Sequence, residues 1–410
     1  MQEFDVAIVG GGMVGASCAL ALAGTGRSVV LVEGVAPQSS VQPSFDERTT
    51  ALGNASRRIF EGLGVWERMR PAAAAIRTIH VSEAGRFGFA RLKADAQGID
   101  AFGYVVSNRV IGSALWGALQ NAAGINLRSP ARPESVEIGP DAVTLTIVDA
   151  AGEHERLRVR VIVAADGAHS MVRTAAGIEA RIEDYGQVAL VAHVQADRPN
   201  DGTAFERFTP SGPLAVLPVQ DGSFALVWTV VPADAERLLA LADTEFLAEL
   251  QARFGWRAGA FVRAGRRASY PLNLTRADAT VALRTALIGN AAQALHPVAG
   301  QGFNLGLRDA AMLAELIASG GEDPGAAALL AQFAAWRASD RSGVIRFTDG
   351  LIKLFGDTRA GVGVLRNFGL LLFDLMPPAK SALARVSAGF GGPTPRLARG
   401  LNLVGLRSLD

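Results

Sequence analysis

Three glycines near the N-terminus have a spacing that brings a polypeptide backbone close to a phosphate. Gly10, Gly12 and Gly15 follow the pattern G-x-G-x-x-G, and Glu33 comes about 20 residues later. The first glycine permits a tight turn, the second lets a pyrophosphate approach the backbone, and the third lets a helix pack on a strand. The carboxylate of Glu33 would accept hydrogen bonds from a ribose. These residues therefore predict a dinucleotide site.

A second candidate site lies in residues 289–309, which read GNAAQALHPVAGQGFNLGLRD. The apolar run 286–288 before it predicts a short buried strand, and the apolar spacing over 303–317 predicts a helix. A glycine loop between a strand and a helix N-terminus presents free backbone N–H groups, which bind an anion or the polar edge of a ring. An ordinary turn before a helix is the alternative interpretation.

Two charged residues have positions that suit a ligand. Asp166 follows the apolar run 159–165 and precedes Gly167. It is therefore predicted at the carboxyl end of a parallel strand, where ligands bind in such sheets. Arg48 follows a loop rich in serine and proline, and its guanidinium has the fork geometry that binds a diphosphate. A simple turn at Asp166 and a solvated surface arginine at Arg48 are the alternatives.

The elements that must position these residues follow from hydrophobic periodicity. Residues 6–32 predict a strand–helix–strand unit around the first glycine motif. A helix is expected at 109–122, with Asn108 as its N-cap. Residues 187–274 contain strand-like segments separated by proline and glycine, which predicts a mostly antiparallel sheet.

These patterns predict an α/β fold, α+β overall, with a discontinuous Rossmann-like nucleotide-binding domain. That domain is expected from residues 1–75, 97–180 and 275–345. A mostly antiparallel β-sheet domain for the substrate is expected from residues 76–96 and 181–274, and a C-terminal helical region from 346–410.

Composition excludes several functional classes. The 40 basic and 39 acidic residues nearly cancel, which argues against a nucleic-acid partner. The single cysteine, Cys18, cannot form an internal disulfide or a dithiol redox pair. The five histidines lack metal-ligand spacing, so no metal is expected.

Taken together, the glycine motif with Glu33, the pair Asp166–Gly167 and residues 289–309 resemble the three fingerprints of the single-component FAD-dependent aromatic hydroxylases. They occur in the family's order across almost the whole chain. The details of residues 289–306 resemble the ubiquinone-biosynthesis branch, near its 2-polyprenyl-6-methoxyphenol hydroxylases. The chain departs from most of the wider family at Asn290 and Gln293, where aspartate and histidine are usual.

The resemblance implies a role for each motif. Arg48 and Arg109 would reach the phosphate or ribityl region of FAD, and Gly302 and Phe303 would offer backbone N–H groups to the flavin pyrimidine oxygen. The implied cofactor-binding residues are Gly10, Gly12, Gly15, Glu33, Arg48, Arg109, Asp166, Asn290, Gly300, Gln301, Gly302, Phe303 and Asn304. Pro297 would lie over the reactive face of the ring, and His296 would shape that loop rather than transfer protons.

The implied chemistry uses FAD, NAD(P)H as a transient co-substrate and molecular oxygen. NAD(P)H would reduce FAD, oxygen would add to give a flavin hydroperoxide, and a polyprenylated phenol would be hydroxylated. The protein would orient the reactants and exclude water. Hydroxylation at another ring position of the same pathway, and a flavin-stabilised scaffold without catalysis in a quinone-biosynthesis complex, are alternatives.

A polyprenylated phenol implies an encounter at a membrane surface. The apolar segment 362–376 is too short and too polar to span a bilayer, but it could dock peripherally on lipid. Packing on protein is the alternative. The chain is therefore expected in the cytoplasm, with contact to the inner face of the cytoplasmic membrane and to other quinone-biosynthesis proteins.

Overall fold

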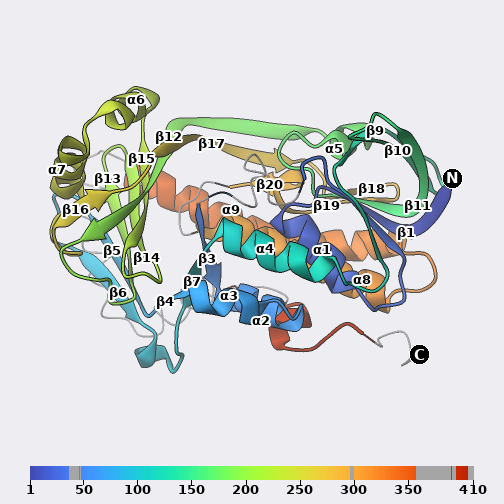
Figure 1. The fold of residues 1–410 in the computed structure, drawn as a ribbon, viewed down its shortest axis with the longest axis horizontal. Coiled ribbons are helices and arrows are strands. Elements are labelled where there is room, and N and C mark those ends of the chain that lie inside the picture. The colour runs from blue at the N-terminus through green and yellow to red at the C-terminus, as the bar shows by residue number, and fades with distance from the viewer. Residues whose placement is uncertain (37–45, 47, 296–299, 357–388, 390–393, 405–410) are drawn as a thin grey trace.

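The computed structural model describes residues 1–36, 46, 48–295, 300–356, 389 and 394–404. A mixed lobe of helices and strands holds the N-terminus, and a strand-rich lobe lies at the other end of the long axis (Figure 1). Parallel pairing in the first lobe and mainly antiparallel pairing in the second confirm the predicted fold class. The domain boundaries stay a prediction.

The mixed lobe is built on a parallel sheet in the order β19–β11–β1–β2–β8. Its strands are β1 (Gln2–Val9), β2 (Val29–Val32), β8 (Ile125–Arg128), β11 (His154–Ala164) and β19 (Thr285–Leu287). The Val, Ile and Leu side chains in the centre of this sheet are buried on both faces, as in a parallel sheet covered by other layers. Gly10 and Asp166 therefore lie at the same edge, where β1 and β11 end.

Antiparallel strands extend this sheet at two places. β18 (Val281–Ala282) pairs with β19 at the edge. β10 (Val143–Asp149) pairs with β11, and β9 (Ala131–Ile138) pairs with β10. The three strands β9, β10 and β11 form an antiparallel meander at this side of the sheet.

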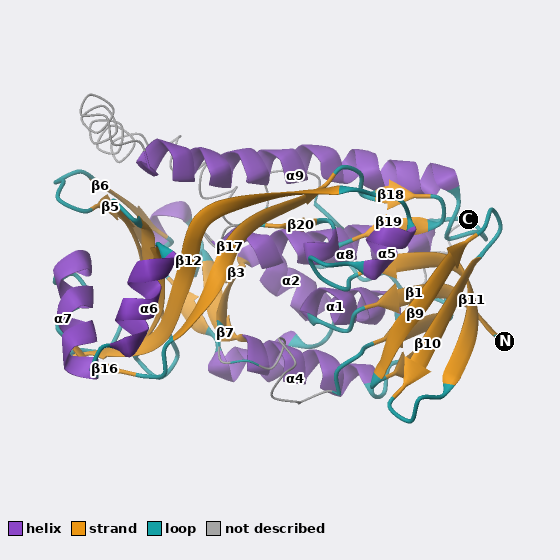
Figure 2. Cartoon of the chain, turned by 90° about the horizontal axis from the view of Figure 1, so that it is seen from above, coloured by secondary structure: helices purple, strands orange, loops and turns teal. Residues whose placement is uncertain are grey.

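The helix layer on the parallel sheet is centred on α1 (Met13–Leu22), which packs against α4 (Asn108–Leu119) and α8 (Gln301–Ser319). α1 buries Gly15, Ala16, Cys18 and Ala19, and these small residues let α8 approach closely. α2 (Asn54–Gly62), α3 (Trp66–Met69) and the turn η2 (Arg70–Ala72) cover the other side of this core. α9 (Ala327–Gly356) runs from the mixed lobe to the strand-rich lobe (Figure 2).

The strand-rich lobe contains a second sheet in the order β20–β17–β12–β15–β14–β13–β5–β6, with β16 paired to β12. These strands are β5 (Thr78–Glu83), β6 (Phe89–Lys93), β12 (Ala180–Ala196), β13 (Thr203–Thr209), β14 (Gly212–Pro218), β15 (Phe224–Val230), β16 (Phe261–Ala264), β17 (Ala268–Ala277) and β20 (Gln293–Ala294). The pair β13–β5 is parallel, and the others are antiparallel.

One face of the second sheet is covered by α6 (Pro232–Ala240) and α7 (Asp243–Phe254). Leu214, Leu226 and Trp228 on this face pack against Phe246 and Leu250 of α7. The opposite face is turned toward the mixed lobe (Figure 1). A small antiparallel sheet of β3 (Thr49–Gly53), β7 (Gly103–Ser107) and β4 (Ala74–Ile76) lies between the two lobes.

Two long strands connect the lobes as a continuous ribbon. β12 has 17 residues, which span about 55 Å when extended. Its first part pairs with β17 beside the mixed lobe, and its last part pairs with β15 inside the second sheet. A register shift between Asp184 and Gln187 bends the ribbon, which Figure 2 shows as a long curve.

Several elements differ from the expectation. The N-cap of α4 is Ser107, whose hydroxyl accepts the N–H of Val110, because the Asn108 side chain instead bonds Thr50 and Asp46. Residues 394–404, expected within a helical region, form loops around the short turn η6 (Leu397–Arg399), whose Leu397 packs on α2.

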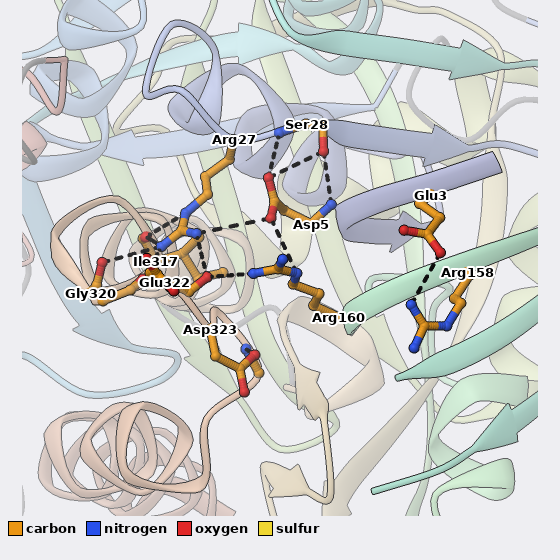
Figure 3. Close-up of polar contacts among 12 residues, drawn as sticks. Glu3, Asp5, Arg27, Ser28, Arg158, Arg160, Ile317, Gly320, Glu322 and Asp323 are labelled. Atoms are coloured by element: carbon orange, nitrogen blue, oxygen red, sulfur yellow. Dashed lines mark hydrogen bonds and ion pairs between the residues drawn. The ribbon is translucent and has the colours of Figure 1, made fainter. Parts of the chain in front are cut away.

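The end of α8 far from the glycine loop is held by a buried arginine. Arg27 donates to the carbonyl oxygens of Ile317 at 3.2 Å, Gly320 at 3.2 Å and Glu322 at 3.0 Å (Figure 3). Ile317 lies in the last turn of α8, where a helix leaves carbonyl groups without partners, and Gly320 and Glu322 follow the helix directly. Asp5 lies between Arg27 and Arg160 and balances part of their charge.

Candidate functional site

The first glycine motif forms a turn that admits no side chain. Gly10 has φ of +101°, and a Cβ atom there would collide with the carbonyl of Ala165. A Cβ at Gly15 would collide with the carbonyl oxygen of Gly10. Gly12 is the N-cap of α1, and no described side chain caps that end. The turn therefore presents the first amides of α1 to a ligand, as the spacing predicted.

Glu33 is buried beside this turn and orders it. Its carboxylate accepts the N–H of Gly11 at 2.6 Å and the N–H of Val35 at 2.8 Å. The indole of Trp116 on α4 donates to the carbonyl oxygen of Gly11 at 3.0 Å. Glu33 thus supports the turn in addition to the ribose contact expected of it. Trp116 was not found from the sequence, because nothing local connects α4 to the glycine motif.

Asp166 lies in the same corner with an unused hydrogen-bonding atom. One carboxylate oxygen accepts the N–H of Val172 at 3.2 Å, but Oδ1 is buried without a partner in the described part of the chain. Burial raises the pKa of Asp166 above its ordinary value. A buried acceptor without a partner costs free energy, so a hydroxyl group of a ligand would stabilise it.

The second glycine motif reaches this corner from the other side. Gly289, with φ of +57°, begins the turn η4 (Gly289–Ala291), and a Cβ there would lie 3.1 Å from Val14 of α1. A Cβ at Gly306 of α8 would lie 2.9 Å from the Cα of Gly289. α1, η4 and α8 therefore meet through glycines. Asn290 projects from η4 and is exposed, which suits contact with a ligand rather than with the core.

Two arginines fix the backbone that follows Asn290. Arg173 donates to the carbonyl oxygen of Ala291 at 3.0 Å, and Arg341 donates to that of Ala292 at 3.1 Å. The side chain of Gln293 is buried and donates to Asp309 of α8 at 2.7 Å. Asn290 and Gln293 therefore have different roles: Asn290 faces outward, and Gln293 joins β20 to α8.

The N-terminus of α8 is open to a ligand. Gly300 is its N-cap in the left-handed conformation with φ of +59°, and none of the described side chains caps it. A Cβ at Gly300 would lie 3.1 Å from the Cβ of Ala51 on β3. Gln301, Gly302 and Phe303 form the first turn, whose N–H groups have no partner within the helix. The ring of Phe303 stacks on Phe60 of α2, so only its backbone is available to a ligand.

The side chain of Asn304 is fully used inside the protein. Its amide nitrogen donates to the carbonyl oxygens of Ala51 at 2.8 Å and Gly300 at 2.7 Å. Its oxygen accepts the N–H of Gly53 at 2.8 Å and the hydroxyl of Ser56 at 2.6 Å. Any contact of Asn304 with a cofactor would therefore use its backbone, and the side chain positions the loop before α8.

The predicted arginines lie at the lobe boundary. Arg48 forms an ion pair with Asp46 at 2.5 Å and lies over the ring of Tyr270 of β17, 4.6 Å from its centroid. Arg109, in the first turn of α4, is exposed, and its N–H donates to the carbonyl oxygen of Asp46 at 3.2 Å. Arg48 is therefore already paired, and a phosphate contact would have to share it with Asp46. Neither Asp46 nor Tyr270 was singled out from the sequence.

The predicted residues His296 and Pro297 lie outside the described residues. Within the described ranges, no group of histidine, cysteine and carboxylate side chains could hold a metal ion. The site instead combines two helix N-termini that no described side chain caps, a glycine turn and a buried acceptor. Positive helix ends bind a diphosphate and stabilise negative charge on a polar ring. Asp166 Oδ1 suits a sugar or ribityl hydroxyl, so these residues fit FAD.

Comparison with known proteins agrees with this geometry. The family described as FAD binding domain matches residues 3–348. The ubiquinone hydroxylase UbiL of Rhodospirillum rubrum is 39% identical over 406 residues, covering 97% of this chain and 93% of that protein. The 3-demethoxyubiquinol 3-hydroxylase of Escherichia coli is 32% identical over 380 residues, covering 90% and 94%. The chain belongs to this FAD-binding family. It is a FAD-dependent monooxygenase of the ubiquinone-biosynthesis branch.

The fold is shared with solved monooxygenases. The p-nitrophenol 4-monooxygenase PnpA of Pseudomonas putida DLL-E4 superposes with a TM-score of 0.79 at 19% identity, over 96% of this chain and 99% of that one. The predictions of the family, the enzyme class and the cofactors are thereby confirmed. The role of each individual site residue stays a prediction.

Proposed function

We propose that this FAD-dependent monooxygenase hydroxylates the ring of a polyprenylated phenol. The support is the convergence of three separate sequence motifs on one corner, together with the relatives named as ubiquinone-pathway hydroxylases. Gly10 and Gly12 would bind the pyrophosphate through backbone N–H groups, and Asp166 and Asn290 would bind ribityl hydroxyls. Bound FAD would supply the redox chemistry, taking hydride from NAD(P)H and activating molecular oxygen.

The part played by the protein is orientation and electrostatics. The first-turn amides of α8, at Gly302 and Phe303, would donate to the pyrimidine edge of the flavin, and the positive end of the helix would stabilise negative charge there. Asn304 would hold the glycine loop in place through its contacts with Ala51 and Gly53. The second sheet would cover the ring and exclude water from it.

The experiment is a turnover assay with purified, FAD-loaded protein and 2-prenyl-6-methoxyphenol, a substrate analogue with one isoprene unit. We expect NAD(P)H oxidation that the phenol stimulates, and a product that gains one atom of oxygen from ¹⁸O₂. A strain without the protein should accumulate a quinone precursor that lacks one ring hydroxyl. Flavin reduction without any hydroxylated product, and unchanged quinone lipids in the deleted strain, would instead support the non-catalytic scaffold.

A lipid substrate implies access from a membrane surface. Within the described residues no helix is long and apolar enough to cross a membrane. The docking segment expected at 362–376 lies outside the described residues. We propose peripheral contact with the inner face of the cytoplasmic membrane. Liposome flotation of the wild type and of a Leu371→Glu, Phe373→Glu double variant tests this, and equal flotation of both FAD-loaded proteins would move the contact elsewhere.

A further inference from the structure

Glu206 of β13 is a carboxyl group that has no part in the proposed FAD site. Side chains alternate across a strand. Phe205 packs edge-on against Phe254 of α7, with 5.5 Å between ring centroids, and Arg207 donates to the carbonyl oxygen of Arg253 at 3.0 Å. Both neighbours therefore face α7. Glu206 must face the other side of the sheet, which is turned toward the mixed lobe (Figure 1).

That side of the sheet faces the open end of α8. Ala204 of β13, Ile79 of β5 and Leu217 of β14 pack with Ala51 of β3 and with β4 and β7. Ala51 is also the residue that a Cβ at Gly300 would touch at 3.1 Å. The small sheet therefore connects the face that carries Glu206 with the glycine loop before α8. Glu206 is one step along β13 from Ala204 on this same face.

The described neighbours of Glu206 in the sheet supply no partner for its carboxyl group. Its neighbours in register are Ala215 of β14 and Val81 of β5, which are small and apolar. The side chain is partly buried, and within the described part of the chain it makes no hydrogen bond or ion pair. Burial raises the pKa of Glu206 from 4.5 to about 7. A carboxyl group in this state exchanges a proton readily near neutral pH.

Neighbouring charges do not account for the raised pKa of Glu206. Glu83 lies on the same face, two residues beyond Val81, and has an interaction of its own. The facing residues of β14, Ala215 and Leu217, carry no charge. Arg207 belongs to the opposite face. Glu206 thus has apolar side chains directly beside it in the sheet, while Glu83, His193 and Tyr270 lie elsewhere on the same face. A buried carboxyl group with apolar neighbours is unfavourable for folding and suits a chemical role.

We propose that Glu206 accepts the proton of the phenolic hydroxyl of the bound substrate. This step rests on the proposed function. The phenol O–H bond breaks, its proton passes to the carboxylate, and the electron pair stays on the ring oxygen. The ring becomes more nucleophilic at the positions ortho and para to that oxygen. A ring carbon would then form the new C–O bond with one atom of O₂ and would lose its hydrogen as a proton. The O–O bond would break with two electrons that NAD(P)H supplies through bound FAD, and the second oxygen atom would leave as water. Glu206 finally returns its proton to the phenolic oxygen.

The test follows the ionisation of the bound phenol in the oxidised, FAD-loaded enzyme, without turnover. The probe is 2-prenyl-6-methoxyphenol, and the signal is the ultraviolet difference spectrum of the phenolate between pH 6 and pH 9. In the wild type we expect phenolate well below the pKa of the free phenol. Glu206→Gln should bind the phenol in its neutral form and hydroxylate it roughly 10²-fold more slowly. Glu206→Asp should recover part of the phenolate signal, and Glu83→Gln should retain all of it.

An equal phenolate signal in wild type and Glu206→Gln would overturn the proposal while leaving the proposed function intact. So would a Glu206→Asp variant that recovers nothing although it holds FAD and binds the phenol. A wild type that neither binds nor hydroxylates the phenol would overturn the proposed function, and the role of Glu206 with it. Flavin content and thermal unfolding establish that each variant is folded.

Discussion

Asn304 concentrates four hydrogen bonds in one buried amide, and this makes it the most sensitive side chain of the glycine loop. In Asn304→Leu the polar groups of Ala51, Gly53 and Gly300 lose their partner, and each unpaired buried group costs about 1–3 kcal/mol. We expect the free energy of unfolding to fall by about 3 kcal/mol or more, and FAD to bind more weakly. Urea unfolding and flavin titration measure the two effects.

The matched control is Asn290→Ala, because Asn290 is exposed. Its unfolding free energy should change by no more than about 0.5 kcal/mol, while FAD affinity falls if the side chain binds the ribityl chain. A stable Asn304→Leu variant with normal FAD affinity would contradict the bonding described for this residue.

Glu206 also makes a prediction about stability against pH. Its pKa is raised to about 7 in the folded protein, so the folded state binds the proton more tightly than the unfolded state. Stability is therefore complete below pH 4.5 and is lost as pH rises through 7. Glu206→Gln cannot ionise, and it should be more stable than the wild type at pH 8, by on the order of 2–3 kcal/mol.

Thermal unfolding of both proteins at pH 5 and pH 8 measures this difference, and the gap should be small at pH 5. Glu236→Gln, at an exposed position of α6, is the control and should show no such trend. A constant difference across the pH range would mean that Glu206 is not held in an apolar environment.

At the scale of single residues, the sequence predicted those whose role depends on their neighbours along the chain. The spacing of Gly10, Gly12 and Gly15 specifies a turn, and the turn forms as expected. Trp116 and Glu206 could not be found, because their environments come from segments distant in the chain. The pairing of Arg48 with Asp46 and Tyr270 was missed for the same reason.

Among the elements, α8 is held at the end opposite to the cofactor. Arg27 satisfies several of its terminal carbonyl groups, as Figure 3 shows. Arg27→Leu should lower the free energy of unfolding by about 2–4 kcal/mol, because buried acceptors lose charged donors. Arg158 in the same figure pairs with Glu3 at 3.1 Å, and both side chains are exposed. Arg158→Leu should cost less than about 1 kcal/mol. A similar loss of unfolding free energy in the two variants, measured by urea unfolding, would contradict the role of Arg27 in holding the end of α8.

The close packing of α1 on the glycine turn leads to a further prediction, in which a glycine of α1 is compared with a glycine of α9. In Gly15→Ala the new methyl group meets the carbonyl oxygen of Gly10, so α1 must move away from the turn. We expect loss of bound FAD and a destabilisation of about 1–3 kcal/mol. Gly343 of α9 has open space around it, and Gly343→Ala should stabilise by up to about 1 kcal/mol. Flavin absorbance and thermal unfolding report both, and a Gly15→Ala variant that keeps full FAD would refute the close packing.

Element types were predictable because each strand and helix carries its own periodicity. β1, α1, β2 and α8 appear close to where the pattern placed them. Their ends were less predictable. Ser107 caps α4 because Asn108 is drawn to Thr50 and Asp46, which belong to another segment. Likewise β16 and β17 are separate strands although both pair with β12, because β16 pairs with its last residues and β17 with its earlier ones.

At the scale of the whole molecule, a buried ion network joins α8 to the long helix α9. Asp340 of α9 bonds Arg308 at 2.8 Å and Arg337 at 2.6 Å, and Arg337 also bonds Asp309 at 2.6 Å. Burial alone would raise the pKa of Asp340, but the two arginines hold it below its ordinary value. The network therefore stabilises the fold above pH 4 or so, and its contribution is lost as pH falls through the pKa of the folded state.

Asp340→Ala removes the carboxylate that neutralises the buried guanidinium groups of Arg308 and Arg337. We expect the free energy of unfolding to fall by about 3–5 kcal/mol. Asp234→Ala removes an exposed partner of Arg237 at 3.6 Å and should be nearly neutral. Urea unfolding at pH 7 compares the two variants. A small effect of Asp340→Ala would mean that water reaches Arg308 and Arg337.

Which strands pair across the molecule was not readable from the sequence. The antiparallel character of the second sheet was predicted, but the parallel pair β13–β5 joins residues far apart in the chain. The ribbon of β12 and β17 likewise depends on a register shift after Asp184, which no local sequence pattern predicts. Contacts between segments distant in the chain determine both the pairing of β13 with β5 and the register shift of the ribbon.

The late position of α8 in the chain has a consequence for synthesis on the ribosome. α8 contributes the second helix end of the flavin corner and fills the space against α1, yet it begins at Gln301. Until α8 has left the exit tunnel, the face of α1 that carries small buried residues is not covered, and the proposed FAD site is incomplete. A nascent chain therefore carries exposed apolar surface until α8 has been made, and such surfaces attract chaperones. The cofactor site can be completed only after α8 has left the exit tunnel.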